Sequence, residues 1–513
     1  MSQLQCSLKL YLEQNKAHVV EEDKDSPSLI NGNAAGEVAR SLFPGGVLVE
    51  TMSNVVDPFE KTKNLMQDAS VQTIFEATFL SDGVEVRADI MNRTKEGWDL
   101  IEVKSSTKPE DHHLNDAAIQ AWVIYKAGVT LSSVSLMHID RDFDYKGDQD
   151  YSSLFITKDI TEDAFHRQSR VEQAIEDSKR TVKGKEPKAE MSSHCNKPNG
   201  CACKSHCAGI APSDHISYLP RGHVAQKKMA EVGITRITQI PHGVLKSDTH
   251  QMVRQVVMQD KELYIPGIKQ SLDRLPYPHH YLDFESVQFA VPRFEGVKPW
   301  RQIPFQWSDH VRYSNGNIEH KEFLDVTGDD PRRVFAETLI EECCHDEGAV
   351  IVYNKAFEQM IMRDLGNDYP DLKEPLKRIS NRCFDMLPEM RNHFYHPDMK
   401  GSWSIKKVLP SFIPGMNHNQ LETIQSGTEA QVAYLRLTDP NWHGDKVKLE
   451  ENAREYCKYD TLSMVKLVDG VYERENMGLD INEWRSHDIK TLQSLPSDEK
   501  SMSDDSPKGI RVG

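Results

Sequence analysis

The chain has 513 residues, of which 38% are hydrophobic and 27% are charged. This length exceeds what one hydrophobic core usually serves, so we expect two to four domains. The sequence contains no apolar run long enough to span a bilayer, and its first residues lack the apolar core of a secretory signal. These features predict a cytoplasmic protein without a membrane partner. The formal net charge of −17 excludes a surface that is basic throughout, but it is compatible with one basic groove.

Four parts follow one another along the chain. In the first, an acidic and turn-rich stretch at residues 18–33 predicts a loop, and helix-like and strand-like patterns alternate after it. The second reads as charged or short helices with Pro and Gly breaks, and the third as a further α/β domain. The last reads as a helix end and a tail of disordered composition. We therefore predict an α/β protein divided into residues 1–160, 161–275, 276–480 and 481–513.

A first group of charged residues lies on two predicted strands, residues 84–93 and 98–106. Asp89 lies on the first strand. Glu102 and Lys104 lie two residues apart on the second, so they point to the same face. Two carboxylates and a lysine at paired strand ends can hold a divalent metal, while the lysine orients water or stabilises charge on phosphate. The alternative is a solvated hairpin with an exposed ion pair.

Other residues extend this group. Glu76 in TIFEATF could add a third carboxylate, and Asp116 and Gln120 share one face of a predicted helix at residues 114–128. The stretch RADIMNRTKEGWDLIEVKSST, followed by HHLNDAAIQAWVIY, resembles the RecB-like branch of the PD-(D/E)XK nucleases. The resemblance implies a nuclease domain with a mixed sheet flanked by helices, and Mg²⁺ or Mn²⁺ as cofactor. It implies these catalytic residues: Asp89, Glu102, Lys104 and Gln120.

Four of the nine cysteines fall within CNKPNGCACKSHC, residues 195–207. In a reducing compartment, clustered cysteines indicate a metal site rather than disulfides. Several RecB-like nucleases clip the N-terminus to a later segment with an iron–sulfur cluster, and the early cysteine in CSLKLYL resembles their first ligand. The resemblance implies a helical iron–sulfur linker region in which four thiolates hold a [4Fe-4S] cluster: Cys6, Cys195, Cys201 and Cys207.

Zinc is the alternative to the iron–sulfur cluster. Under the iron–sulfur interpretation, Cys203 is a spare thiol. A structural zinc ion would be held by the four clustered cysteines, or by three of them with His194 or His206. Four unligated cysteines are not expected, because this polar segment offers no apolar surroundings in which to bury them.

A second group of carboxylates lies in the third part of the chain. Asp283 and Glu285 share one face of a strand in HHYLDFESV. A helix after the strand AVIVY carries Glu358, and a later helix carries Tyr456 and Asp460 on one face. Such carboxylates can bind two divalent ions for phosphodiester cleavage, and the tyrosine can position the attacking water.

These segments resemble the DnaQ-like, or DEDD, 3′–5′ exonucleases of the ribonuclease H-like fold. Asp283 and Glu285 match the first motif, and Tyr456 with Asp460 matches the tyrosine form of the last. In NKAFE, Glu358 stands where the family usually has aspartate. The resemblance implies that this glutamate is a metal ligand with the other carboxylates. Asp385, after a short predicted strand, is a structural or compensating carboxylate in this interpretation.

Longer stretches, among them YLDFESVQFAVPRFEGVKPWRQIPFQWSDH and YCKYDTLSMVKL, resemble one bacterial family of uncharacterised proteins. That family joins a RecB-like half with a cysteine cluster to a DnaQ-like half. The segment KGSWSIKKVLP could approach a nucleic-acid backbone, or it is an ordinary loop before a helix. Its polar and basic candidates are Lys400, Ser402, Ser404, Lys406 and Lys407.

We therefore predict a metal-dependent nuclease with two phosphodiesterase modules, bridged by an iron–sulfur segment. The expected partner is nucleic acid, with DNA favoured over RNA, and the DnaQ-like module would trim 3′ ends. One alternative is a nucleic-acid-binding or scaffold protein with inactive sites, which Glu358 and the acidic net charge favour. Another is an RNA exonuclease, because DnaQ-like sites act on both polymers.

Overall fold

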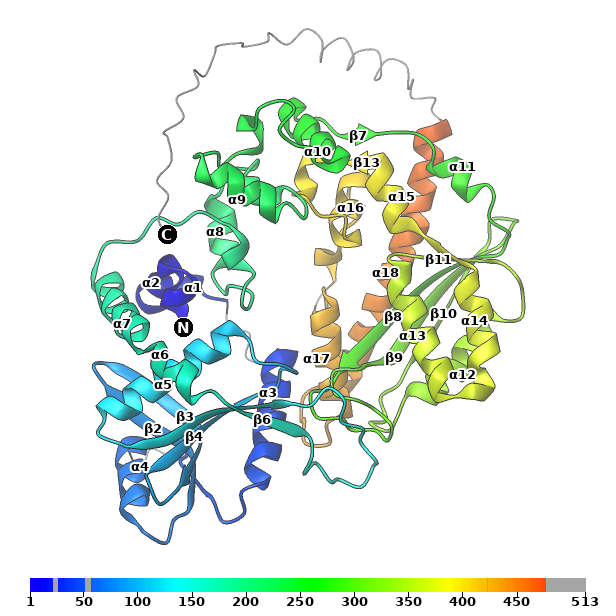
Figure 1. Ribbon diagram of the computed structural model, residues 1–513. Helices are drawn as coiled ribbons and strands as arrows, with labels where there is room; N and C mark the ends of the chain where they lie inside the picture. Colours follow the sequence, from blue (N-terminus) through cyan, green and yellow to red (C-terminus); the bar gives the residue numbers. More distant parts are fainter. Residues whose placement is uncertain (22–25, 51–56, 422, 477–513) are drawn as a thin grey trace, which may run out of the picture.

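The computed structural model describes residues 1–21, 26–50, 57–421 and 423–476, so the predicted disordered tail lies outside the described residues. The fold is mixed α/β, as the sequence predicts, and the described strands form three sheets (Figure 1). Among the described helices, none combines the length and apolar composition needed to cross a membrane.

The first sheet has six strands in sequence order. They are β1 Val47–Leu48, β2 Thr73–Ser81, β3 Val84–Arg93, β4 Trp98–Lys104, β5 Leu131–Ile139 and β6 Phe155–Asp159. Strands β2, β3 and β4 form an antiparallel meander, and β4 then pairs in parallel with β5. Helix α5, Asp111–Lys126, makes the crossover that a parallel pair requires. Strands β3 and β4 coincide with the two predicted strands that carry the first charged group.

The other helices of this half lie around the sheet. They are α1 Ser2–Gln5, α2 Ser7–Asn15, α3 Pro27–Ser41, α4 Pro58–Gln67, α6 Thr161–His166 and α7 Gln168–Lys183, with the 3₁₀ turn η1 Ala17–Val19. The loop predicted at residues 18–33 is wrong from Pro27 onward. Ser26 accepts a hydrogen bond from the backbone N–H of Leu29, and Pro27 occupies the first helical position. The stretch predicted as a loop therefore contains a helix start.

Helix α3 connects the two halves of the chain. Asn31 is 4% exposed, and its side chain donates to the backbone oxygen of Gln288 at 3.1 Å. Its oxygen accepts from the backbone N–H of Ala290 at 2.6 Å. A second bond joins the halves where the indole N–H of Trp300 donates to the oxygen of Ser105 at 2.7 Å. The loop after β8 is thus fixed against the first sheet.

The second sheet has five strands in the order β10-β9-β8-β11-β12. They are β8 His279–Gln288, β9 Gln302–Arg312, β10 Ile318–Leu324, β11 Ala349–Val352 and β12 Cys383–Asp385. Strands β8, β9 and β10 are antiparallel, whereas β8, β11 and β12 are parallel. Strand β8 is central and mostly buried, so its two carboxylates stand out in an otherwise largely apolar environment.

Helices cover both faces of the second sheet (Figure 1). They are α12 Arg332–Cys343, α13 Lys355–Asp368, α14 Lys373–Asn381, α15 Met386–His393, α16 Ile405–Phe412, α17 Gly427–Thr438 and α18 Lys446–Asn476. Three 3₁₀ turns lie between them, η5 Pro370–Leu372, η6 Pro397–Met399 and η7 His418–Gln420. Helices α12 and α13 pack on one face of the sheet, and α17 and α18 on the other.

The segment between the sheets is helical, as predicted. It contains α8 Lys204–Ile210, α9 His223–Glu231, α10 Asp248–Gln259 and α11 Ile268–Leu272, with η2 Ser193–Cys195, η3 Ile216–Tyr218 and η4 Ile237–Gln239. Strand β7, Leu263–Tyr264, pairs with β13, Phe394–Tyr395. Apolar residues of this segment, such as Ile216, share one core with residues of α16 and α18. The later part of the segment therefore packs as one unit with the third part of the chain.

The helical segment packs closely against the turn at the start of the KGSWS segment. Lys400 and Gly401 both have positive φ, at 46° and 77°. A Cβ atom on Gly401 would lie 1.9 Å from the backbone oxygen of Tyr218. Only glycine fits both the backbone conformation and the space, so this turn seats the helical segment against α16.

Replacing Gly401 by alanine tests that contact. Gly415→Ala is a matched control, because Gly415 also has positive φ, at 91°, but faces open space. The control should lose about 1 kcal/mol from backbone strain alone. Gly401→Ala should lower the melting temperature by roughly 5 °C more, because the turn must move away from Tyr218. Equal melting temperatures for the two variants in differential scanning calorimetry would contradict this packing.

Candidate functional sites

The first predicted group meets where β3, β4 and α5 come together. We call it the Lys104 site, and it consists of Asp89, Glu102, Lys104, Asp116 and Gln120. The ammonium of Lys104 lies 2.6 Å from Oε1 of Glu102 and 2.7 Å from Oδ2 of Asp116. The side-chain amide of Gln120 donates to Oε2 of Glu102 at 2.7 Å. The four residues that the sequence predicted as catalytic therefore lie in one place, with Asp116 added.

Burial at the Lys104 site opposes ionisation of Asp89 and Glu102, whereas Lys104 stays charged. Burial, and next the charge of Asp89, raises the pKa of Glu102 well above its ordinary value. Burial also raises the pKa of Asp89, although the backbone N–H of Val103 donates to it at 2.7 Å. Burial alone would lower the pKa of Lys104, but its two carboxylate neighbours outweigh this and raise it. A positive charge is thus fixed beside acids that repel one another.

Glu76 lies at the edge of the Lys104 site. The register of β2 and β3 places it across from Asp89, and its backbone has a positive φ of 56°. A non-glycine residue with positive φ in a strand is unusual. Burial, and next the charge of Asp89, raises the pKa of Glu76, while the guanidinium of Arg40 lies 3.6 Å from its carboxylate. Glu76 is therefore in a position to extend the acidic group, as the sequence predicted.

The second predicted group is the cysteine cluster, which we define as Cys6, Cys195, Cys201 and Cys207. These four line one narrow cavity of about 20 Å³. Cys6 lies in the extended break between α1 and α2, nearly two hundred residues before the others. All nine cysteines of the chain are free thiols. The structure thus brings the early cysteine to the later segment.

Hydrogen bonds from Gln5 hold the two segments together. Its side-chain nitrogen donates to the backbone oxygens of His194, Lys197 and Asn199 at 2.9, 3.2 and 3.0 Å. A main-chain bond from Glu21 to the oxygen of Ala202, at 2.9 Å, adds a second connection. These bonds position Cys6 independently of any ligand.

Cys203 differs from the other cysteines of the segment. It is 1% exposed and packs with Leu8 and Leu12 of α2. Burial raises the pKa of its thiol to about 12. Of the two histidines considered for zinc, His194 lines the same cavity and His206 does not. Cys203 therefore has a packing role, although it lines the same cavity as the other four.

The third predicted group forms the Asp283 site, which we define as Asp283, Glu285 and Asp460. One carboxylate oxygen from each residue lies within 4.8 Å of the others. The first two come from β8 and the third from α18, and both Glu285 and Asp460 are buried. Burial is the main cause that raises the pKa values of Asp283 and Glu285 well above the ordinary range, and neighbouring carboxylates add to it. Oxygen-only ligands at this spacing suit Mg²⁺ or Mn²⁺.

Glu358 approaches this site from the first turn of α13. It is 2% exposed, and its Oε2 has no hydrogen-bond partner among the described residues. Burial, and next the charge of Asp283, raises its pKa well above the usual value. An unpaired buried carboxylate oxygen is costly unless another group satisfies it. This orphan atom fits a further cation ligand beside the three carboxylates.

Three more side chains surround the Asp283 site. The ammonium of Lys406 donates to the hydroxyl of Tyr456 at 3.0 Å. Lys406 was predicted to approach a nucleic-acid backbone, and it lies on the same side of the site as that tyrosine. Burial, and next the Glu285 carboxylate, raises the pKa of Tyr456, so this phenol keeps its proton. His418 bonds Oδ1 of Asp460 through Nε2 at 2.6 Å.

Asp385 has a structural role. Its carboxylate accepts from the backbone N–H groups of Asn354 and Lys355 at 3.0 and 3.1 Å, and from Leu387 at 3.0 Å. Asn354, at the start of α13, has a positive φ of 93°. Asp385 thus holds the strained turn that places Glu358, and it caps α15.

Sequence reasoning missed His418 and a second buried group. His418 lies in the 3₁₀ turn η7, and nothing in the letters HNQ indicates its partner 42 residues later. At the start of β8, His280 bonds Asp309 through Nδ1 at 2.6 Å and Asp346 through Nε2 at 3.2 Å. Both ring nitrogens of His280 therefore have carboxylate partners, whereas the buried Oδ1 of Asp309 has no hydrogen-bond partner among the described residues.

Comparisons with known proteins give little functional information. A family model described as Domain of unknown function (DUF2779) matches residues 280–404, from β8 to the start of α16. A protein of Ureaplasma parvum serovar 3, described as Uncharacterized protein UU173, is 25% identical over 222 residues, which is 37% of this chain. The matched part is 31% of that relative, so the chain spans about a third of its length. No solved structure matches the chain.

Proposed function

We propose that the chain is a metal-dependent nuclease with two phosphodiesterase sites. The observation that carries this proposal is the Asp283 site, where three carboxylates from β8 and α18 lie within 4.8 Å of one another. The orphan oxygen of Glu358 and the pair of Lys406 and Tyr456 complete a set suited to phosphodiester hydrolysis. In this proposal the site trims 3′ ends of single strands, with DNA favoured over RNA.

The strand arrangements support the two modules. The order β10-β9-β8-β11-β12, with three antiparallel and then parallel strands, fits a ribonuclease H-like sheet. The antiparallel meander β2-β3-β4, with α5 crossing to β5, fits a PD-(D/E)XK core. Both modules carry their charged groups on the central strands. We also propose a cytoplasmic location, which suits a chain with nine free thiols.

A divalent cation held by the Asp283 site would supply Lewis-acid charge to the phosphate and lower the pKa of a bound water. Tyr456 keeps its proton and is held by Lys406, so its hydroxyl can orient a water beside Asp460. The ammonium of Lys406 offsets negative charge that builds up on the phosphate. His418 fixes the orientation of Asp460 through its 2.6 Å bond and acts as a positioning residue.

At the Lys104 site, the same reaction class would use different residues. Asp89 and Glu102 are the donors that could hold Mg²⁺ or Mn²⁺, with Glu76 at the edge. Lys104 keeps its charge and can stabilise a pentavalent phosphate or orient water. In the described conformation, both oxygens of Glu102 are bonded, to Lys104 and to Gln120. Substrate or metal binding must rearrange these contacts.

The cysteine cluster is proposed to hold a [4Fe-4S] centre. Five cysteines line one cavity, and the four that include Cys6 but leave out the packed Cys203 fit the four-thiolate requirement of such a cluster. Structural zinc remains the alternative, because His194 lines the same cavity and zinc also accepts four sulfur or nitrogen ligands. Either centre would join α1 and α2 to the segment that follows α7.

A scaffold protein with inactive sites is the second candidate function. Glu358 favours it, because glutamate replaces the shorter aspartate of the exonuclease motif and changes where the carboxylate can reach. The two candidates differ in one observable property, which is metal-dependent strand cleavage.

Cleavage assays with two isosteric variants test the nuclease proposal. Wild-type protein should cut single-stranded DNA or RNA, or double-stranded DNA, when Mg²⁺ or Mn²⁺ is added. Asp283→Asn should slow stepwise 3′ trimming by roughly a hundredfold or more, because one metal ligand loses its charge. In that background, Lys104→Met should remove the remaining cleavage. The exposed Asp329→Asn is the matched control and should act as wild type.

Two results would contradict the proposal. If wild-type protein cleaves none of these polymers with either cation, the scaffold candidate is the better one. If Asp283→Asn trims 3′ ends as fast as Asp329→Asn, the Asp283 site is not the exonuclease centre.

Iron analysis of anaerobically purified protein tests the cysteine cluster. We expect a brown protein with about four irons per chain. Cys6→Ser should lose iron as completely as Cys201→Ser. Cys203→Ser should keep it, because Cys203 packs against α2 as a spare thiol. Full iron in Cys6→Ser would rule out the proposed clip, and about one zinc per chain would identify the alternative centre.

A further inference from the structure

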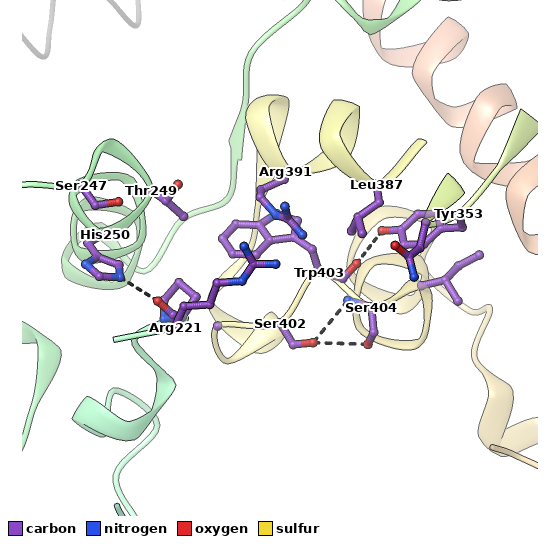
Figure 2. A pocket seen from close by; sticks show the side chains of 14 residues that line it. Arg221, Ser247, Thr249, His250, Tyr353, Leu387, Arg391, Ser402, Trp403 and Ser404 are labelled. Carbon is purple, nitrogen blue, oxygen red and sulfur yellow. Dashed lines mark hydrogen bonds between the residues drawn. The ribbon is translucent and has the colours of Figure 1, made fainter. Parts of the chain in front are cut away.

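A pocket separate from the three groups above lies between the helical segment and the second sheet. It has a volume of about 740 Å³. The helical segment contributes Arg221, Ser247 and His250, and the other side contributes Arg391 and the Ser402–Ser404 stretch (Figure 2). The pocket lies where the two parts share a core, and Gly401 of the tight turn is one of its lining residues.

Charge in this pocket has one sign. The chain carries 79 Asp and Glu residues and a net charge of −17, yet none of the fourteen residues drawn around the pocket is acidic. Figure 2 shows the side chains of Arg221 and Arg391 extending into the same space. Among the described residues, neither guanidinium has a hydrogen bond or a salt-bridge partner. Two unpaired arginines that face one pocket repel each other unless an anion binds between them.

Neutral groups in the pocket also suit an anion. Ser247 and Ser404 precede α10 and α16, and neither makes a side-chain capping bond. The first N–H groups of both helices are therefore available, and helix N-termini attract negative charge. The hydroxyl of Ser402 accepts from the backbone N–H of Ser404 at 3.3 Å and donates to the Ser404 hydroxyl over a long 3.4 Å. Both hydroxyls can donate to a phosphate oxygen.

Two helices carry residues of both the pocket and the surroundings of the Asp283 site. Asn354 lines the pocket and precedes α13, and Glu358 follows it by about one helical turn. Ser404 lines the pocket and precedes α16, and Lys406 follows it by two residues. Helix α13 thus joins the pocket to Glu358 of the candidate exonuclease centre, and helix α16 joins it to Lys406.

The size of the pocket and its apolar wall fit a ligand larger than a phosphate ion alone. A volume of about 740 Å³ falls within the range of organic ligand pockets. Leu387, Trp403 and Ile405 supply an apolar wall. The indole N–H of Trp403 donates to the oxygen of Phe394 at 2.8 Å, and the hydroxyl of Tyr353 donates to the oxygen of Trp403 at 2.7 Å. The wall is therefore fixed, and a base could rest against it.

We propose that this pocket binds a backbone phosphate of single-stranded nucleic acid, through Arg221 and Arg391, while the strand's 3′ end lies at the Asp283 site. The placement of the 3′ end at the Asp283 site rests on the proposed function, because it assumes that the strand continues to the carboxylates. The binding itself needs no metal and no cleavage.

Fluorescence anisotropy in EDTA tests the pocket without catalysis. The probe is a labelled single strand of about ten nucleotides, as oligothymidylate or oligouridylate. Arg221→Gln and Arg391→Gln should each weaken binding about tenfold. Each should also reduce the slope of log affinity against log salt by about 0.7. Arg274→Gln removes an exposed charge outside the pocket and should stay within about twofold of wild type. Arg221 is exposed, so its variant suffices if Arg391→Gln does not fold.

Three outcomes separate the pocket from the nuclease proposal. If both pocket variants bind the strand as tightly as Arg274→Gln, or if wild type binds no strand, the inference is overturned. If inorganic phosphate or adenosine monophosphate raises the melting temperature of wild type but not of Arg221→Gln, while the strand does not bind, the pocket takes free anions and the strand assignment is overturned. If the variants lose binding and wild type cleaves nothing, the pocket is supported and the nuclease proposal fails.

Discussion

Repulsion among buried carboxylates is the constraint around which the second half of the chain is organised. Asp283, Glu285 and Asp460 have oxygens within 4.8 Å of one another, and Glu358 adds an orphan oxygen nearby. Buried like charges at this spacing cannot all ionise without compensation. Lys406 provides one positive charge for four acids. Such a buried acidic group costs stability unless it is compensated, which supports the proposed cation-binding role.

The surrounding elements hold these acids in place. Asp283 and Glu285 are fixed by the pairing of β8 with β9 and β11, while Asp460 is fixed by the long helix α18. Glu358 depends on the turn that Asp385 secures through three backbone bonds. The Lys104 site differs, because its lysine and Gln120 already engage both oxygens of the central glutamate. Side chains of the protein therefore bond both oxygens of the central glutamate at the Lys104 site, whereas Lys406 offers one positive charge to the four acids at the Asp283 site.

Local patterns predicted much of this arrangement. Alternation along β4 placed Glu102 and Lys104 on one face, and the helical period placed Tyr456 one turn from Asp460. The early Cys6 was linked to the later cysteines by resemblance, and the structure brings them together through Gln5. Local composition failed at α3, where Ser26 and Pro27 start a helix inside the stretch predicted as a loop. His418 and the pocket at Arg221 and Arg391 could not be predicted, because their partners meet only through tertiary packing.

The central claim is that the Asp283 site binds divalent cations. Anomalous diffraction from crystals grown with Mn²⁺ would test it most directly, because it locates the ions without reference to activity. The account predicts manganese in contact with oxygens of Asp283, Glu285 and Asp460, and its loss in Asp283→Asn crystals. Well-occupied manganese elsewhere on the protein, with none among these three carboxylates, would contradict the account.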